Sequence, residues 1–193
     1  MNSKIDFRED ITKCIDVLRA GGIILYPSDT KWSLGCDATN QQAVQKLFDL
    51  IKSNGTSAIT ILIDNPSKLQ TYLNEVPEMA WDLIEMSDKP LTIIYSEPKN
   101  LATKLYRSDN TIAIRVTKDE FSRNLCTRFR NPIVAVSPNL KDNTKPLVFS
   151  QIDKELISKI DFVVSFKQYE TNIHQQSSII MLGKGNIFRL IRE

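Results

Sequence analysis

The chain has 193 residues, with 25 Lys and Arg against 23 Asp and Glu, which gives a formal net charge of +2. Hydrophobic residues make up 41% and charged residues 25%, a balance that is typical of a folded globular protein and excludes intrinsic disorder, a collagen-like repeat and a coiled coil. No apolar run approaches the ~18 residues that a membrane helix needs, and the first residues lack the apolar core of a signal peptide. We therefore expect one cytoplasmic domain over residues 1–193, monomeric and without a membrane partner.

Cysteine and histidine usage argues against a metal centre. Cys14, Cys36 and Cys126 are widely spaced and form no CxxC motif, so they are typical of buried thiols in a reducing compartment rather than of disulfides or a zinc site. The single histidine, His174, stands in a polar stretch, which disfavours His-rich metal sites and Ser-His-Asp catalysis. The sequence therefore predicts no tightly bound cofactor and no protein-bound metal.

Helices and strands alternate along the chain. The first predicted helix carries Ile11, Cys14, Ile15 and Leu18 on one face and ends at Gly21-Gly22, because glycine accepts the left-handed conformation of a helix end. Apolar runs bounded by Pro, Asp, Asn or Gly predict strands at residues 23–26, 58–63, 91–95, 111–116, 133–136, 162–165, 177–182 and 186–191. Helical patterns predict the remaining helices at residues 41–51, 67–74, 78–86, 118–129 and 150–160. This order predicts a mixed α/β sheet covered by helices.

Two predicted loops follow buried strands, at Pro27–Thr30 and at Ser137–Asn139. Both hold small hydroxyl or amide groups at the carboxyl end of a strand, which is where open α/β sheets bind their ligands. The same residue types also form turns for purely local reasons. Each loop is therefore interpreted either as a turn or as part of a ligand site.

Arg115 is the unusual residue of the apolar strand 111–116. One interpretation is an edge-strand or salt-bridged arginine, and the other is a planar guanidinium that binds a carboxylate or a phosphate through paired N–H groups. Neither the P-loop nor the Rossmann glycine motif occurs, so a phosphate would be bound in another way. A further group, Arg123, Arg128 and Arg130, is interpreted as a solvated helix face or as a contact with RNA phosphates.

Six separated segments, in order across about residues 10–192, resemble the YrdC-like family, the threonylcarbamoyl-AMP synthase domain of tRNA modification. The longest is LYPSDTKWSLGCD at 25–37, which resembles the family's YPTDTxYGLGxDA signature with Ser33 in place of a glycine. The others are KPLT at 89–92, TIAIRV at 111–116, PIVAVSPN at 132–139, SSII at 177–180 and IR at 191–192, which resemble GPLT, TVAVRVP, PIVxTSAN, STVVD and LRxG.

The resemblance implies a single-domain α/β (α+β) fold, in which helices flank a twisted sheet of mixed parallel and antiparallel strands with a concave, positive cavity. It also implies a nucleotidyltransferase reaction, in which ATP, L-threonine and bicarbonate give threonylcarbamoyl-AMP and pyrophosphate, with Mg²⁺ on the ATP phosphates. RNA, as tRNA or double-stranded RNA, is a further expected partner. By the family's pattern, threonine contacts Thr30, Arg115, Ser137 and Ser178, with Arg115 on its carboxylate, and the nucleotide contacts Thr111, Asn139 and Arg192.

The segment after the second predicted helix departs from the family's pattern. The family has a KxR motif there and another polar or basic residue further on, and these positions align with Ile51, Ser53 and Ser57. After Lys52 the next cation is Lys68, so the expected triphosphate clamp has lost most of its charge. Whether the chain is an enzyme is therefore open. The alternatives are a synthase rebuilt at its triphosphate end and a paralogue that binds RNA, a nucleotide or a small acid without synthesis.

Overall fold

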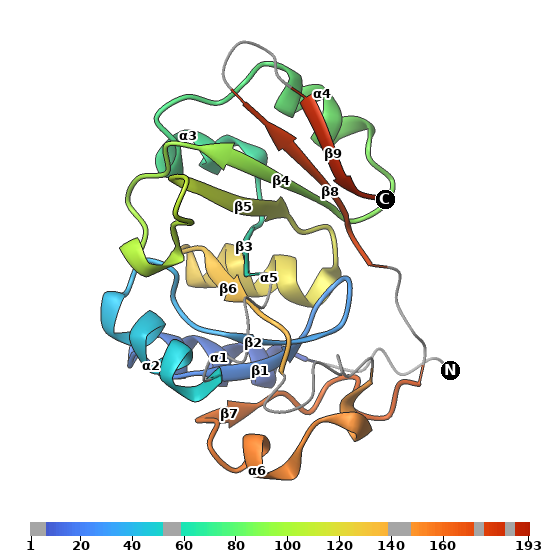
Figure 1. Ribbon diagram of the computed structural model, residues 1–193. Helices are drawn as coiled ribbons and strands as arrows, with labels where there is room; N and C mark the ends of the chain where they lie inside the picture. The colour runs from blue at the N-terminus through green and yellow to red at the C-terminus, as the bar shows by residue number, and fades with distance from the viewer. Residues whose placement is uncertain (1–6, 52–58, 139–147, 172–175, 184–187) are drawn as a thin grey trace.

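The computed structural model describes residues 7–51, 59–138, 148–171, 176–183 and 188–193 (Figure 1). Within these residues the strands form two sheets. The smaller has the order β2-β1-β7, with β1 at Ile24–Pro27, β2 at Trp32–Gly35 and β7 at Phe162–Val163. The larger has the order β6-β3-β5-β4-β8-β9, and its strands are β3 (Thr60–Ile63), β4 (Leu91–Ser96), β5 (Thr111–Val116), β6 (Ile133–Ala135), β8 (Ser178–Leu182) and β9 (Phe188–Arg192).

The two sheets meet along β2 and β6. Isolated bridges join Leu34 to Val136 and Asp37 to Ile133. Each sheet mixes strand directions, since β1 is antiparallel to β2 and parallel to β7, while β5 is antiparallel to β4 and parallel to β3. The predicted mixed arrangement is confirmed, but the one expected sheet is divided in two. β2, which was not predicted, turns back from β1, and in the described residues it is joined to β6 by isolated bridges rather than by a continuous ladder, so β2 and β6 belong to different sheets.

Helices pack on the sheets, with α1 (Arg8–Arg19) and α5 (Glu120–Phe129) behind them in the view of Figure 1. These two helices contact each other, and α5 also contacts β3. The chain leaves α1 through Gly21, whose φ of +74° is the left-handed conformation expected at a glycine helix end. The other helices are α2 (Gln41–Ile51), α3 (Leu69–Tyr72), α4 (Met79–Met86) and α6 (Lys154–Ile157), with 3-10 turns η1 (Pro66–Lys68), η2 (Thr103–Leu105) and η3 (Phe149–Gln151). In the described ranges no helix is long and apolar enough to cross a membrane.

Two of the predicted helices are divided. The expected helix at 150–160 consists of η3 and α6, because the Asp153 side chain accepts a hydrogen bond from the Glu155 N–H and so starts a new helix. The expected helix at 67–74 is η1 followed by α3, and it ends at Leu73, whose backbone is extended. Both changes lie away from the larger sheet's centre, and they leave the strand order unaffected.

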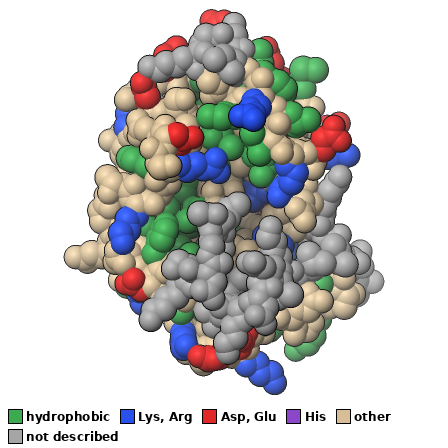
Figure 2. Space-filling model, viewed as in Figure 1, with side chains coloured by type: hydrophobic (Ala, Val, Ile, Leu, Met, Phe, Trp, Pro, Cys, Tyr) green, Lys and Arg blue, Asp and Glu red, His purple; other side chains and the backbone are tan. Residues whose placement is uncertain are grey.

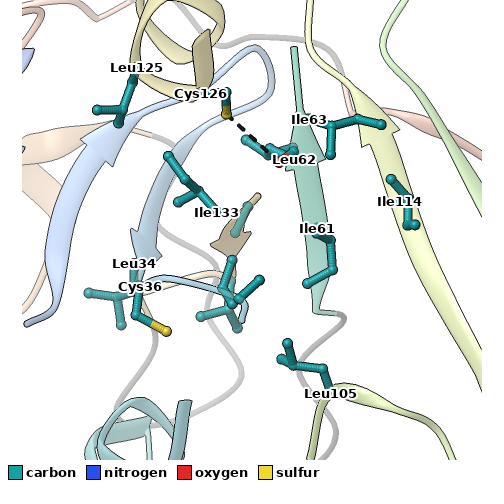
Figure 3. Close-up of a cluster of buried hydrophobic side chains, with 14 of the residues drawn as sticks. Leu34, Cys36, Ile61, Leu62, Ile63, Leu105, Ile114, Leu125, Cys126 and Ile133 are labelled. Atoms are coloured by element: carbon teal, nitrogen blue, oxygen red, sulfur yellow. Dashed lines mark hydrogen bonds between the residues drawn. The ribbon is translucent and has the colours of Figure 1, made fainter. Parts of the chain in front are cut away.

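The core lies between the two sheets and α5. Ile61 and Leu62 of β3 are fully buried there, and the Cys126 Sγ atom of α5 lies 3.7 Å from the Leu62 carbonyl oxygen (Figure 3). The three cysteines are buried and free, as predicted. Burial raises the pKa of the Cys36 thiol to about 12 and raises those of Cys14 and Cys126 still further. These thiols therefore stay protonated and act as small apolar side chains.

Candidate functional site

One face of the larger sheet carries the arginines and threonines of the candidate site. Residues directly opposite each other in neighbouring strands point to the same face. The registers pair Ile94 with both Ala113 and Met181, and they pair Met181 with Arg189. Side chains alternate along β4 and β5, so Thr92, Thr111 and Arg115 point to the same face as Ile94 and Ala113. The pairing of Ile179 with Arg192 adds Arg192 to this face. We call it the basic face, and its arginines and threonines are Thr92, Thr111, Arg115, Arg189 and Arg192. Figure 2 shows Lys and Arg side chains beside hydrophobic ones in this part of the molecule.

Arg115 is buried in the middle of the larger sheet. Its side chain is 4% exposed, and its Nη2 atom lies 3.3 Å from Oδ1 of Asp29, whose side chain is 10% exposed. Because β5 lies between β3 and β4, the edge-strand interpretation is wrong, whereas the salt bridge is confirmed. The Nε atom of Arg115 is also buried and has no hydrogen-bond partner among the residues that the structure describes. A buried donor without an acceptor costs about 1–3 kcal/mol, so this N–H favours an acceptor on a ligand.

Asp29 stands in the turn between β1 and β2. Ser28 closes this turn, because its N–H and its hydroxyl both donate to the Lys31 carbonyl oxygen, at 3.1 and 2.7 Å. The hydroxyl oxygens of Thr30 and Ser33 lie 3.4 and 3.5 Å from Ser28 Oγ. The turn interpretation of this loop is therefore confirmed, and the same turn presents the Asp29 carboxylate to the basic face.

Arg192, at the end of β9, is the second anchored arginine of the basic face. Its Nε and Nη2 donate to the Ser177 carbonyl oxygen at 3.0 and 2.6 Å, and Nη2 also lies 3.1 Å from Ser177 Oγ. Burial lowers the pKa of Arg192, and the positive charge of Arg115 lowers it further. Both guanidinium groups belong to the basic face, where their positive charges would attract a bound anion.

Ser177 is a candidate residue that the motifs missed. The motif-based prediction is Ser178, but Ser178 pairs with Leu91 and precedes Ile179, so its side chain points to the face of β8 opposite to Ile179. Ser177 is 4% exposed, and its hydroxyl accepts a hydrogen bond from Thr92 on the basic face at 3.1 Å. The two serines point to opposite faces because side chains alternate along a strand. The register between β4 and β8 is needed to tell which of the two lies on the basic face.

The remaining predicted residues have different environments. Thr111 begins β5 and is buried, and its hydroxyl donates to Asp109 Oδ1 at 2.6 Å. Ser137 is buried two residues after β6 and follows Val136, whose bridge to Leu34 joins the two sheets. Asn139 and His174 lie outside the described residues. Thr111 is thus on the basic face and Ser137 at the junction of the sheets, while nothing further follows for Asn139.

The end of α2 contains the departure from the family pattern. The helix ends at Ile51, and its last turn holds no basic residue. The other residues of this departure lie outside the described ranges: Lys52, Ser53 and Ser57. The described part of this segment therefore agrees with the loss of charge that the sequence predicts.

A small pocket of about 120 Å³ opens beside Asp29, and its wall also includes Ile84, Ser87, Leu91, Val116 and Lys118. Val116 follows Arg115 in β5 and points to the opposite face, so Asp29 stands between this pocket and Arg115. Across the described ranges, no group of three or more His, Cys, Asp and Glu side chains is arranged to hold a metal ion.

The α5 cluster, as we call the three arginines of α5 and its C-terminal end, is exposed, as the interpretation as a solvated helix face expects: Arg123, Arg128 and Arg130. Arg128 Nη2 lies 3.4 Å from the Thr12 hydroxyl oxygen of α1, and Arg130 ends α5 with a left-handed φ of +74°. Contact between this cluster and RNA remains a prediction.

Comparison with known proteins identifies relatives over most of the chain. A protein-family profile described as telomere recombination, Sua5/YciO/YrdC, matches residues 16–193. The chain is 29% identical over 157 residues to a threonylcarbamoyl-AMP synthase of Pseudoalteromonas translucida, which covers 80% of this chain and 84% of that protein. A relative of the same name from Riesia pediculicola is 27% identical over 150 residues, covering 76% of this chain and 80% of its own.

Two solved structures share the architecture. P. abyssi Sua5 complexed with L-threonine superposes with a TM-score of 0.82 at 23% identity, over 93% of this chain and 52% of its own. This chain therefore spans about half the length of that protein. E. coli YciO superposes with a TM-score of 0.80 at 21% identity, over 97% of this chain and 90% of its own. At these identities the likeness is one of fold, and it confirms the predicted YrdC-like fold class.

Proposed function

The chain belongs to the Sua5/YciO/YrdC family, and from this premise we propose that it is a nucleotidyltransferase that makes threonylcarbamoyl-AMP for tRNA modification. Its substrates are ATP, L-threonine and bicarbonate, and its products are threonylcarbamoyl-AMP, pyrophosphate and water. The observation that carries the proposal is the buried guanidinium of Arg115, whose Nε has no acceptor within the described structure and which shares the basic face with Arg192. Such a planar, charged donor suits the carboxylate of an amino acid.

The proposed reaction has two bond-forming steps. The threonine amine attacks the carbon of bicarbonate, and loss of water leaves a carbamate. A carbamate oxygen then attacks the α-phosphorus of ATP, the bond from this phosphorus to the bridging oxygen breaks, and pyrophosphate leaves. Mg²⁺ arrives on the ATP phosphates as part of the substrate and neutralises their charge. The protein contributes by holding the reactants in line and by stabilising the negative charge that develops.

The proposed contacts lie on or beside the basic face. Arg115 holds the threonine carboxylate through Nε, and Thr30 and Ser137 supply hydroxyl groups from the two loops. For the serine contact predicted at Ser178 we favour Ser177, because its hydroxyl is the one that Thr92 holds on the basic face. The proposed nucleotide contacts are Thr111, Asn139 and Arg192.

The test is pyrophosphate release from Mg-ATP that depends on both L-threonine and bicarbonate, with the adenylate identified by mass spectrometry. Arg115→Gln should lower the rate about a hundredfold, which is the ~3 kcal/mol that the loss of one charged donor at a reacting centre costs. The matched control is Arg128→Gln, which removes an exposed arginine from α5 and should retain the wild-type rate. No release above background from folded wild-type protein would sink the proposal.

A second candidate function is favoured by the uncharged end of α2. If the cations lost at Ile51 and Ser53 are indispensable, the protein binds threonine or another small acid without forming the adenylate. The same assay separates the two candidates when it is combined with direct binding of L-threonine. Binding without release, together with release restored by Ile51→Lys/Ser53→Arg, would establish the binding paralogue. Release by the wild type would exclude it.

A further inference from the structure

Thr117 directly follows β5 and extends the basic face by one more side chain. Its N–H donates to the Ile63 carbonyl oxygen at 2.9 Å, so the pairing of β5 with its neighbour β3 continues past the last residue of β5 (Figure 1). Side chains alternate along such a pair, which places Thr117 on the same face as Arg115. Lys118 agrees with this alternation, because it lines the pocket on the opposite face and its Nζ donates to the Ile84 carbonyl oxygen at 3.2 Å.

The hydroxyl group of Thr117 is buried and has no hydrogen-bond partner among the described residues. Thr117 is 1% exposed, and its Oγ1 atom is inaccessible to solvent. The other threonines of the basic face are paired, since the hydroxyl of Thr92 donates to Ser177 and that of Thr111 donates to Asp109. An unpaired buried hydroxyl lowers the stability of a fold, so this one points to an acceptor that the chain itself does not supply.

Arg115 has the same unsatisfied donor two residues earlier. Its Nε is buried and unpartnered within the described part of the chain, so the Nε–H and the Thr117 hydroxyl do not pair with each other. Two residues of extended strand separate the two Cα atoms by about 6.6 Å. Because each oxygen of a carboxylate accepts hydrogen bonds, one carboxylate between the two side chains would satisfy both donors.

This hydroxyl is a feature of the present chain rather than of the motif that the strand resembles. That motif, TVAVRVP, has a proline at the position of Thr117. Proline has neither an N–H nor a hydroxyl group. The chain therefore gains both the hydrogen bond to Ile63 and the unpaired Oγ1 by having threonine here.

We propose that Thr117 is a further ligand-binding residue of this site, whose hydroxyl donates to the same carboxylate that Arg115 binds through Nε. The inference rests on the proposed function in taking that carboxylate to belong to L-threonine. It assigns to Thr117 a share of the affinity for the amino acid and no part in the chemistry at the α-phosphorus.

Thr117→Val replaces the hydroxyl by a methyl group and tests this assignment. Because an unpaired buried hydroxyl is costly in the free protein, the Tm of the ligand-free variant should rise by about 2–4 °C. Because a hydrogen bond to a charged acceptor is lost, the Kd for L-threonine, measured by calorimetry on the full chain, should rise about tenfold. A residue with a purely structural role would not move stability and affinity in opposite directions.

Thr127→Val is the matched control, because it makes the same change at an exposed residue of α5 whose hydroxyl donates to Asp64 Oδ2 at 2.9 Å. It should leave the Kd for L-threonine within about twofold of the wild type and should not raise the Tm. Thr117→Ser keeps the hydroxyl and should keep the Kd within about threefold. L-α-aminobutyrate has the carboxylate of threonine without its hydroxyl, so Thr117→Val should weaken its binding by the same factor of about ten.

An unchanged Kd for L-threonine in Thr117→Val would overturn the inference, and so would wild-type protein that does not bind L-threonine. A loss confined to L-threonine would also overturn it, because the hydroxyl would then contact the ligand's side chain. Should Thr117→Val fold poorly, Thr117→Ala must show the same loss of affinity, and its absence counts against the inference. Binding that depends on Thr117 without pyrophosphate release would refute the proposed synthase and leave this inference standing. Normal release by Thr117→Val with an unchanged KM for threonine would do the reverse.

Discussion

Replacement of Arg115 by leucine tests the energetic role of its ion pair. The substitution leaves the Asp29 carboxylate, 10% exposed, without the guanidinium that now lies 3.3 Å away. Removing one partner of a buried pair costs about 3–5 kcal/mol, and we expect about 3 kcal/mol here, because Asp29 also borders a pocket. With a urea m-value of ~2 kcal/mol per molar, the unfolding midpoint should fall by about 1.5 M. The assay is equilibrium unfolding in urea, followed by tryptophan fluorescence and by circular dichroism.

The double variant Asp29→Asn/Arg115→Leu decides whether the charge or the packing is responsible. Replacing a whole buried pair by uncharged groups is often nearly neutral, so the double variant should recover about 2 kcal/mol of the loss. Arg128→Leu, on the exposed side of α5, is the matched control and should stay within about 0.5 kcal/mol of the wild type. A double variant as unstable as the sum of the two single variants would refute the reasoning.

Three further predictions concern other parts of the structure. Ser177→Ala removes the hydroxyl beside Arg192 and should weaken ATP binding about threefold to tenfold, as measured by calorimetry. Burial alone would raise the pKa of Asp161, but hydrogen bonds from Lys46 and from the Ile23 N–H lower it overall. The stabilising contribution of Asp161 is therefore complete above its unfolded pKa, near 3.8, and is lost as the pH falls through the lower folded pKa. Because Asp161→Asn lacks this carboxylate, its free energy of unfolding should fall less than that of the wild type over this pH range, as measured by urea titrations in acid. If the α5 cluster binds RNA phosphates, tRNA affinity should fall steeply with salt, and a flat salt response would remove RNA from the proposal.

Local hydrophobic patterns were sufficient to predict the strands and helices whose apolar residues follow a regular period. The expected strand 111–116 matches β5 and the expected helix 41–51 matches α2, because each is a complete apolar pattern with polar residues at both ends. The candidate ligand site followed from motif resemblance rather than from periodicity. Thr111, Arg115 and Arg192 do share one face of the larger sheet, although no local pattern relates β5 to β9.

The unpredicted features depend on contacts between distant segments. β2 was missed because Ser33 and Gly35 interrupt its apolar run, yet Gly35 is what the sheet needs. A Cβ atom at Gly35 would lie 2.6 Å from the ring of Tyr26 and 2.7 Å from the Val134 carbonyl oxygen, so the strand packs where no larger residue fits. The contact of Asp29 with β5 and the parity that selects Ser177 likewise require the register of strands that are far apart in the chain.

The proposed reaction has two requirements, recognition of threonine and activation of ATP, and the chain retains charged residues for the first but lacks expected cations for the second. Recognition of the amino acid needs the guanidinium of Arg115, which is buried in the larger sheet and forms an ion pair with Asp29. Activation of ATP needs cations on the triphosphate, and the last turn of α2 ends at Ile51 without one. Because these two groups of residues lie in different parts of the chain, we expect that a protein unable to form the adenylate would still bind threonine. Affinity for threonine therefore cannot stand as evidence of synthesis, and only release of pyrophosphate distinguishes an active synthase from a protein that has kept the pocket alone.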